Sequence, residues 1–242
     1  CRCGASNRFR YCRTGKLGKG KKFYGKAIYH QLLPQLVAEL DPDRDYIPTT
    51  PFAADNKPNS GTIHQWDIWS GHQPVRQYLC QPQNVPRFVT EFGLQSLPNM
   101  KTIKDFCTIQ QLHIGSFPIE KHNYQLDGNS RIYRYVGDLF ATAKSIEQLV
   151  YLSQVTQARA VKMYVEHLRA HNFRNSGALF WQFNDCCPAI SWSAIDAAYE
   201  PKAIYYYAKR LFSNLLIAVI SEWKKPNTLS LPMFQPLNVT VI

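Results

Sequence analysis

The chain has 242 residues, enough to bury a sizeable core, and its composition excludes a disordered or fibrous protein. Hydrophobic residues make up 45% and charged residues 19%. The formal charge of +11 gathers near the start, where nine basic residues precede the first acidic one, Glu39. This could be a basic arm for nucleic acid. Because no nucleic-acid motif accompanies it and Gly15, Gly18 and Gly20 indicate a solvated loop, we expect no nucleic-acid partner.

The cysteines do not form a recognisable framework. There are seven of them, an odd number with irregular spacing. Cys1, Cys3 and Cys12 could be drawn as a metal site, but no C-x-x-C pair or histidine at ligand spacing accompanies them, so we expect no metal and no cofactor. No apolar run reaches the ~18 residues of a membrane span. We expect no membrane partner and favour a cytoplasmic location; the oligomeric state stays open.

The first half of the chain predicts one helix and three short strands. Apolar periodicity predicts a helix over residues 26–40, interrupted by Pro34. Strands are expected at 46–48, in the run 61–69 and in the run 87–93.

The second half predicts a long helix between two further strands. The pair Ser145 and Gln148 has the spacing of a capping box and predicts the start of that helix. Ahead of it, a short helix is expected over 99–106. Gly177 should open the last strand, and the tail 215–242 alternates apolar and polar residues as a β-sandwich strand does.

Three of the expected strands end in side chains suited to binding or chemistry. The run RFVTEFG (87–93) places Glu91 after a short apolar stretch and before a glycine. The run GTIHQWDIW (61–69) contributes His64 and Trp66, and ALFWQFND (178–185) ends in polar residues. Parallel strands that end at one edge bring such residues together, so these runs point to one carbohydrate-sized site.

Several blocks in the same order carry a resemblance to a known family. They are YHQLLPQL (29–36), DYIPTTPF (45–52), TEFGLQS (90–96) and FWQFNDCCPAISWS (180–193). Together they resemble the β-mannosidases of glycoside hydrolase family 2. The resemblance implies an α/β fold, the (β/α)8 barrel, and a retaining exo-glycosidase that removes terminal β-D-mannose from β-mannoside oligosaccharides.

Length limits how much of that architecture the chain contains. A whole (β/α)8 barrel takes about 250 residues, and the family adds β-sandwich domains. We therefore expect a fragment that is inactive alone: a partial barrel with strands five to eight over residues 1–212, and the truncated start of a β-sandwich over 213–242.

The resemblance also implies roles for individual residues. Glu91 matches the nucleophile. Asn7 falls where the family has its acid/base glutamate, and an amide cannot donate that proton. The remaining positions fall where the family lines the sugar site: His64, Trp66, Trp181, Asn184 and Asp185. Trp66 stands where the family often has a tyrosine, so it keeps an aromatic wall and loses the hydroxyl, and Asn184 and Asp185 could equally cap a turn. Cys187 replaces a family tryptophan, which removes an aromatic wall.

Two readings of function stay open at this stage. The first is a β-mannosidase, with β-glucuronidase, β-galactosidase or exo-glucosaminidase specificity as variants within the same family. The second is a non-catalytic or vestigial sugar-binding product that lacks the general acid, because of Asn7.

Overall fold

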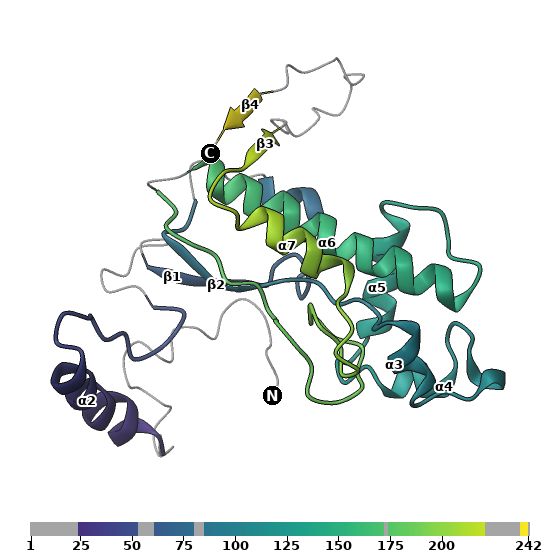
Figure 1. Ribbon diagram of the computed structural model, residues 1–242, viewed down its shortest axis with the longest axis horizontal. Helices are drawn as coiled ribbons and strands as arrows, with labels where there is room; N and C mark the ends of the chain where they lie inside the picture. The colour runs from purple at the N-terminus through teal and green to yellow at the C-terminus, as the bar shows by residue number, and fades with distance from the viewer. Residues whose placement is uncertain (1–23, 53–60, 80–84, 172–173, 221–237, 242) are drawn as a thin grey trace.

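A computed structural model describes residues 24–52, 61–79, 85–171, 174–220 and 238–241. A short parallel sheet lies near its centre, formed by β1 (Thr62–Gln65) and β2 (Phe88–Phe92). The long helix α6 (Ile146–Ala170) and α7 (Ala203–Leu211) run alongside each other on one side of it (Figure 1). The segments that hold Glu91, His64 and Trp66 therefore meet in one sheet.

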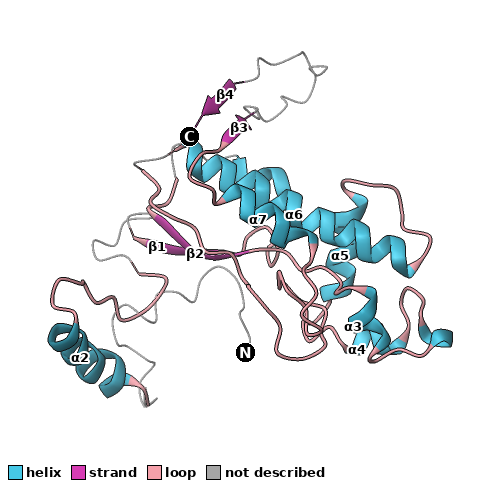
Figure 2. Ribbon diagram, viewed as in Figure 1, coloured by secondary structure: helices cyan, strands magenta, loops and turns pink. Residues whose placement is uncertain are grey.

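A third segment flanks β2 on the side away from β1. Its backbone follows β2 through the hydrogen bonds Val89 N to Gly177 O (3.0 Å), Leu179 N to Val89 O (2.8 Å) and Trp181 N to Phe92 O (2.8 Å). The ladder is a single parallel bridge, Val89 to Ala178, so this segment is drawn as a loop (Figure 2). The predicted last strand is thus present as a parallel strand-like segment.

The strand predicted at 46–48 is wrong, because these residues are irregular. Pro48 has no N–H to donate to a ladder. The Tyr46 hydroxyl donates instead to the carbonyl of Tyr29 at 2.8 Å, which ties this stretch to the helix before it. The neighbouring extended contact is a single antiparallel bridge between Phe52 and Thr62.

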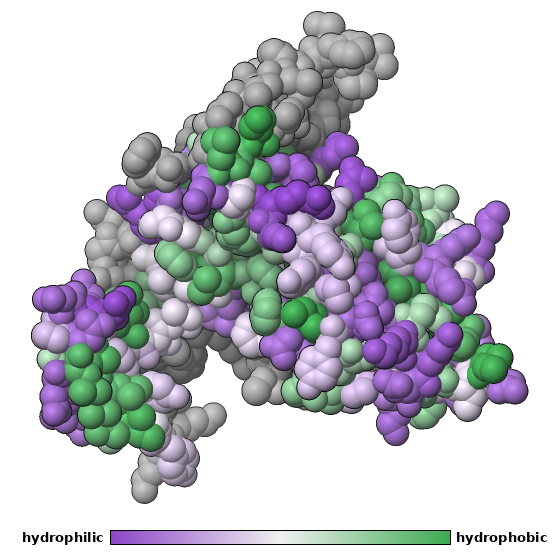
Figure 3. Space-filling view, in the orientation of Figure 1, coloured by the Kyte–Doolittle hydropathy of each residue, from purple (hydrophilic) through white to green (hydrophobic). Residues whose placement is uncertain are grey.

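The predicted helix over 26–40 forms in two parts. A π-helical turn, η1 (Ile28–Leu32), continues without a break into α2 (Leu33–Leu40), so Pro34 lies inside a continuous helix, next to the turn where the regular hydrogen-bond pattern is already altered. Neither element has a buried residue, and their apolar side chains form a hydrophobic patch at the lower left of Figure 3. Leu40 is 78% exposed.

The remaining helices are short, and apart from η2, which precedes β2, they follow β2 along the chain. They are η2 (Val75–Leu79), α3 (Met100–Lys104), η4 (Ile109–Gln111), α4 (Phe117–Lys121) and α5 (Gly128–Gly137). At the end of the chain, β3 (Ile217–Ile220) pairs antiparallel with β4 (Asn238–Val241). In the described part of the chain, no helix is both long and apolar enough to cross a membrane.

Helix α6 begins where the capping box predicts. The backbone N–H of Gln148 donates to Ser145 Oγ at 3.3 Å, while the Gln148 side chain accepts from the N–H of Lys144 at 2.8 Å. In a standard capping box the Gln148 side chain would accept from the N–H of Ser145, so this second bond is made one residue earlier than expected. Most of the apolar side chains along one face of α6 are buried, among them Leu149, Val161 and Leu168.

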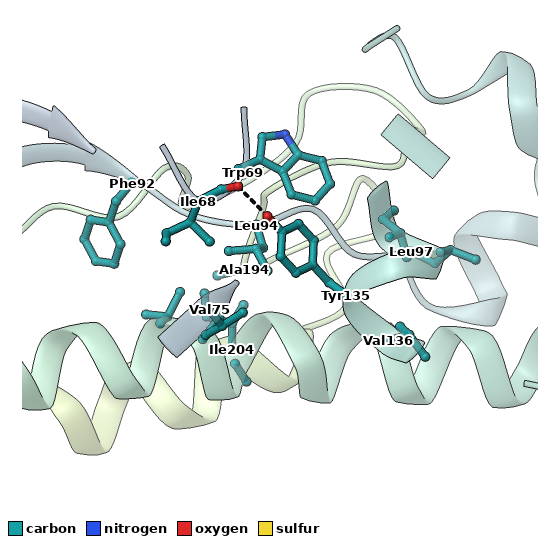
Figure 4. Packing of buried hydrophobic residues seen from close by; sticks show 14 of the residues in the cluster. Ile68, Trp69, Val75, Phe92, Leu94, Leu97, Tyr135, Val136, Ala194 and Ile204 are labelled. Atoms are coloured by element: carbon teal, nitrogen blue, oxygen red, sulfur yellow. Dashed lines mark hydrogen bonds between the residues drawn. The ribbon is translucent and has the colours of Figure 1, made fainter. Parts of the chain in front are cut away.

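The core joins the sheet to α6 through aromatic and aliphatic side chains. Phe92 and Leu94 extend from β2 and the segment after it, and Trp69 stacks on Tyr135 with ring centroids 5.9 Å apart (Figure 4). The Tyr135 hydroxyl donates to the carbonyl of Ile68. Each of these side chains is almost wholly shielded from solvent. Packing in the core therefore holds the residues that follow β1 and β2 in place.

Polar groups of α6 fix the segment that follows Glu91. Gln157 is fully buried, and its Nε2 donates to the carbonyls of Leu94 (2.9 Å) and Trp192 (2.8 Å). Its Oε1 accepts from Ser96 Oγ at 2.7 Å. A buried amide satisfied on both sides holds its partners in one geometry, because a lost bond would leave a desolvated polar group. Helix α6 thereby aligns two segments of the candidate site.

Candidate active site

Glu91 lies in β2 directly beside His64 in β1, since their Cα atoms are partners in the parallel register. Two N–H groups converge on one oxygen of its carboxylate. Trp66 Nε1 donates to Glu91 Oε2 at 3.0 Å, and His64 Nδ1 lies 3.2 Å from the same oxygen. In the described part of the chain no hydrogen bond to Oε1 is seen. Among the described residues, the carboxylate is thus held through one oxygen.

The contacts of His64 determine which of its nitrogens bears the proton. A carboxylate only accepts, so Nδ1 donates to Glu91, and Nε2 then accepts from Thr50 Oγ1 at 3.0 Å. Burial lowers the pKa of His64, and the nearby Glu91 charge opposes that shift. A neutral imidazole at neutral pH orients Glu91 without adding a positive charge.

Trp66 is supported by a cluster of tryptophans. Its ring meets Trp192 edge to face at a centroid distance of 6.2 Å, and Trp192 meets Trp69 in the same way at 6.1 Å. Edge-to-face contacts of this kind restrict ring rotation. Packing against Trp192 therefore holds the Trp66 ring in the orientation in which its N–H donates to Glu91.

Trp181 reaches the site through its backbone. Its N–H donates to the carbonyl of Phe92, one residue after Glu91, and the residue is 43% exposed. The peptide bond from Trp181 to Gln182 is cis. A partly exposed indole beside the carboxylate strand presents a flat apolar face, which suits the apolar face of a pyranose.

Gly93 lets the Trp181 backbone approach β2. A Cβ added to Gly93 would lie 2.5 Å from the Trp181 carbonyl oxygen, closer than atoms tolerate. The glycine that follows Glu91 and Phe92 in the sequence thus marks a close backbone approach.

We expect Gly93→Ala to destabilise the chain by about 1–3 kcal/mol, the usual cost of overpacking. The methyl group must push Trp181 away from β2, which breaks the bond to Phe92. Urea unfolding measures the loss. Gly137→Ala is the control, because nothing lies within 4 Å of a Cβ at that position. Equal stability of the Gly93 variant and the parent would show that the two segments can separate freely.

The structure does not bring Asn184 and Asp185 into contact with Glu91. Asn184 is exposed, and its Nδ2 donates to the carbonyl of Asp185 at 3.2 Å. The Asp185 carboxylate points back into its own loop, where Oδ2 accepts from Ser193 Oγ (2.6 Å) and Ser191 Oγ (2.8 Å). These contacts join the start of the loop at Asp185 to its end near Ser193, while Asn184 stays accessible.

Other predicted features lie elsewhere. Asn7, the position matched to the acid/base, falls outside the described residues. In the described ranges, no group of three or more His, Cys, Asp or Glu side chains could hold a metal ion.

A cavity of about 330 Å³ lies between η2, α6 and α7, and none of the predicted site residues lines it. It is separate from the Glu91 site.

Sequence reasoning missed three residues that shape this site. Thr50 orients His64, Trp192 supports Trp66, and Lys202 lies buried behind the Asp185 loop. Thr50 precedes a proline in a block quoted for the resemblance, and Trp192 stands between two serines in another. Those blocks could have signalled both. Nothing in the sequence indicates that Lys202 is buried.

Comparison with known proteins places this geometry in a family. No family model matches the chain. "Beta-mannosidase B" of Emericella nidulans is 35% identical over 213 residues, and that of Aspergillus flavus 34%. Each match covers 83% of this chain and 24% of the relative. The structure of a β-D-mannosidase from Dictyoglomus thermophilum superposes with a TM-score of 0.76 at 36% identity, over 84% of this chain and 25% of that one.

Along this shared length, the chain is similar to β-mannosidases. The chain spans about a quarter of the curated β-mannosidases it matches. An exo-chitosanase from Amycolatopsis orientalis, 18% identical with a TM-score of 0.51 over 60% of the chain, shares the fold alone. The predicted resemblance to β-mannosidases is confirmed, and these neighbours are consistent with a partial α/β domain.

Proposed function

We propose that the chain supplies the nucleophile half of a retaining β-mannosidase site, with Glu91 as the nucleophile. The convergence of Trp66 and His64 on Oε2 of Glu91 carries this proposal. A nucleophilic carboxylate must be held in one orientation while one oxygen stays free to attack. Two donors on the same oxygen meet both needs.

In the proposed reaction, Glu91 Oε1 attacks the anomeric carbon of a terminal β-mannoside. The bond from that carbon to the glycosidic oxygen breaks, and its electron pair leaves with the aglycone, which needs a proton from the acid. Water then gives a proton to the same acid/base group and attacks the anomeric carbon, which breaks its bond to Oε1, releases mannose and regenerates the carboxylate. As charge leaves the carboxylate, the Trp66 and His64 bonds weaken, and they strengthen again when the ester is hydrolysed.

The sugar would rest on Trp181, with Asn184 available to its hydroxyl groups. The exposed indole face and the exposed carboxamide support these two roles. We assign residues 1–212 to the partial barrel. In this assignment β1, β2 and the segment 176–181 are its sixth, seventh and eighth strands. Residues 213–242, which include β3 and β4, would begin a β-sandwich.

A substrate panel tests the proposal. In a chimera, residues 1–212 replace the corresponding segment of the Emericella nidulans relative, so that the rest of the site is supplied. We expect 2,4-dinitrophenyl β-D-mannoside to be cleaved, because its leaving group needs no proton, with the β-glucuronide, β-galactoside and β-glucosaminide cleaved far more slowly. Preference for another glycoside would overturn the mannose assignment.

Asn7 favours a second candidate, a sugar-binding product without catalysis. An amide at the acid position can hydrogen-bond a sugar but cannot protonate a leaving group. Binding of methyl β-D-mannoside by a chimera that leaves the activated mannoside intact would support this candidate over the enzyme.

A further inference from the structure

Lys202 is a lysine with no exposed surface. Its Nζ donates to the carbonyl oxygens of Ser191 (3.2 Å) and Ser96 (3.3 Å). Ser96 belongs to the segment after Glu91, and Ser191 to the loop after Trp181. The same two residues are joined by the bond from Ser96 N to Ser191 O at 2.9 Å. Lysine is almost never fully buried without partners, so the ammonium group links both sides of the site.

Two carboxylates face this lysine, and each is fixed by hydrogen bonds. Asp185 accepts from the hydroxyl groups of Ser191 and Ser193. Asp196 accepts from the backbone and side chain of Asn99 at 2.9 and 3.0 Å. Burial lowers the pKa of Lys202 to about 8, and the negative charges of Asp185 and Asp196 oppose that shift.

The network closes the loop after Trp181 onto the segment after Glu91. The Asp185 N–H donates to the carbonyl of Ile195 at 3.0 Å, and the Lys202 N–H donates to the carbonyl of Ala194 at 2.8 Å. Trp192, whose ring supports Trp66, lies in the loop between Asp185 and Ala194. A movement of this loop would shift Trp181 on one side and Trp66 on the other.

We propose that Lys202 and Asp185 are positioning residues that hold the Trp181 to Ser193 loop against the Glu91 segment, without touching the sugar. This rests on the proposed function, because it assigns both residues a task within the β-mannoside site. It also gives Asp185 a different role from the sugar ligand expected from sequence.

Hydrogen exchange of the full 242-residue chain tests where the network acts. In Lys202→Met and Asp185→Asn, we expect exchange at the amides of Asp185, Ala194 and Ile195 to accelerate about tenfold or more, while α6 keeps its protection. Lys101→Met is the matched control, because Lys101 pairs with Glu200 at the surface. Equal acceleration throughout the chain, or none in the loop, would overturn the proposal.

The pH dependence supplies a signature of the buried charge itself. The folded pKa of Lys202 is about 8 and its ordinary value is 10.5, so the folded chain binds fewer protons between these values. Stability contributed by this residue therefore rises as pH increases from 8 to 10.5. We expect the difference in unfolding free energy between the parent and Lys202→Met to rise over that range. If the unfolding free energies of the parent and Lys202→Met changed with pH in parallel, the proposal of a buried Lys202 charge would be overturned. Should Lys202→Met not fold, a direct NMR titration of the Lys202 side chain in the parent gives the same test.

Kinetics in the chimera separate this proposal from the proposed function. In Lys202→Met, loss of positioning should raise KM for 2,4-dinitrophenyl β-D-mannoside about tenfold and keep kcat within about threefold. The stacking surface binds the sugar equally in the ground state and in the transition state, so its loss weakens binding more than it slows the chemical step. Loosened exchange with unchanged kinetics in an active chimera would refute the positioning role. An inactive parent chimera combined with loosened exchange would refute the proposed function and leave the loop network standing.

Discussion

Replacing Glu91 by glutamine in the chimera should reduce cleavage of 2,4-dinitrophenyl β-D-mannoside by about 10³-fold or more, because an amide is too poor a nucleophile to form the glycosyl ester. The substitution keeps the size of the side chain and an oxygen that can still accept from Trp66 and His64. The loss should therefore fall on kcat, with folding preserved.

Two measurements sharpen this result. Glu147→Gln changes the same functional group at an exposed position in the first turn of α6, and it should leave turnover unchanged. A 2-deoxy-2-fluoro mannosyl fluoride should leave its sugar on the peptide that contains Glu91, as seen by mass spectrometry. A label on another peptide, or undiminished turnover of Glu91→Gln, would move the nucleophile elsewhere.

The central part of the fold could be predicted because local pattern and packing agree there. Helix α6 has a capping serine and a continuous apolar stripe, so its start and its buried face follow from periodicity alone. The β2 segment combines β-branched and aromatic residues before Glu91, and it forms the predicted strand. Where local preference and tertiary context point the same way, sequence reasoning succeeds.

The failures have the opposite cause. The stretch 46–48 has strand-forming residues, but Pro48 and the bond from Tyr46 to Tyr29 remove it from the sheet. For Asp185 the sequence left sugar binding and turn capping open, and its carboxylate contacts two serines several residues later, which no local pattern indicates. Lys202 shows the same limit, since its partners lie 11 and 106 residues away. Contacts of this range depend on the whole fold.

The candidate site was predictable in its chemistry more than in its contacts. The types of residue at the ends of β1 and β2 indicate a carboxylate beside a histidine and an indole, and the structure places all three together. That Trp66 and His64 share a single oxygen of Glu91 is a matter of distances of about 3 Å, which spacing along the chain cannot give.

Restoring a glutamate at position 7 should produce the second large effect. In the chimera, Asn7→Glu should raise turnover of β-mannobiose about 10²–10⁴-fold, the usual contribution of a general acid, because the sugar leaving group needs a proton. Formation of the glycosyl-enzyme from 2,4-dinitrophenyl β-D-mannoside should change far less, because dinitrophenolate leaves without one. Pre-steady-state release of the phenolate measures that step separately from hydrolysis of the ester.

The contrast between the two substrates is what locates the defect. If Asn7 withholds only the proton, the chain with asparagine forms the ester readily with the activated substrate and barely reacts with the disaccharide. A double variant with Asn7→Glu and Glu91→Gln should be inactive on both substrates, because an acid cannot replace the nucleophile. Equal impairment of both substrates by Asn7, relieved equally by glutamate, would instead place the fault in sugar binding and favour the non-catalytic candidate.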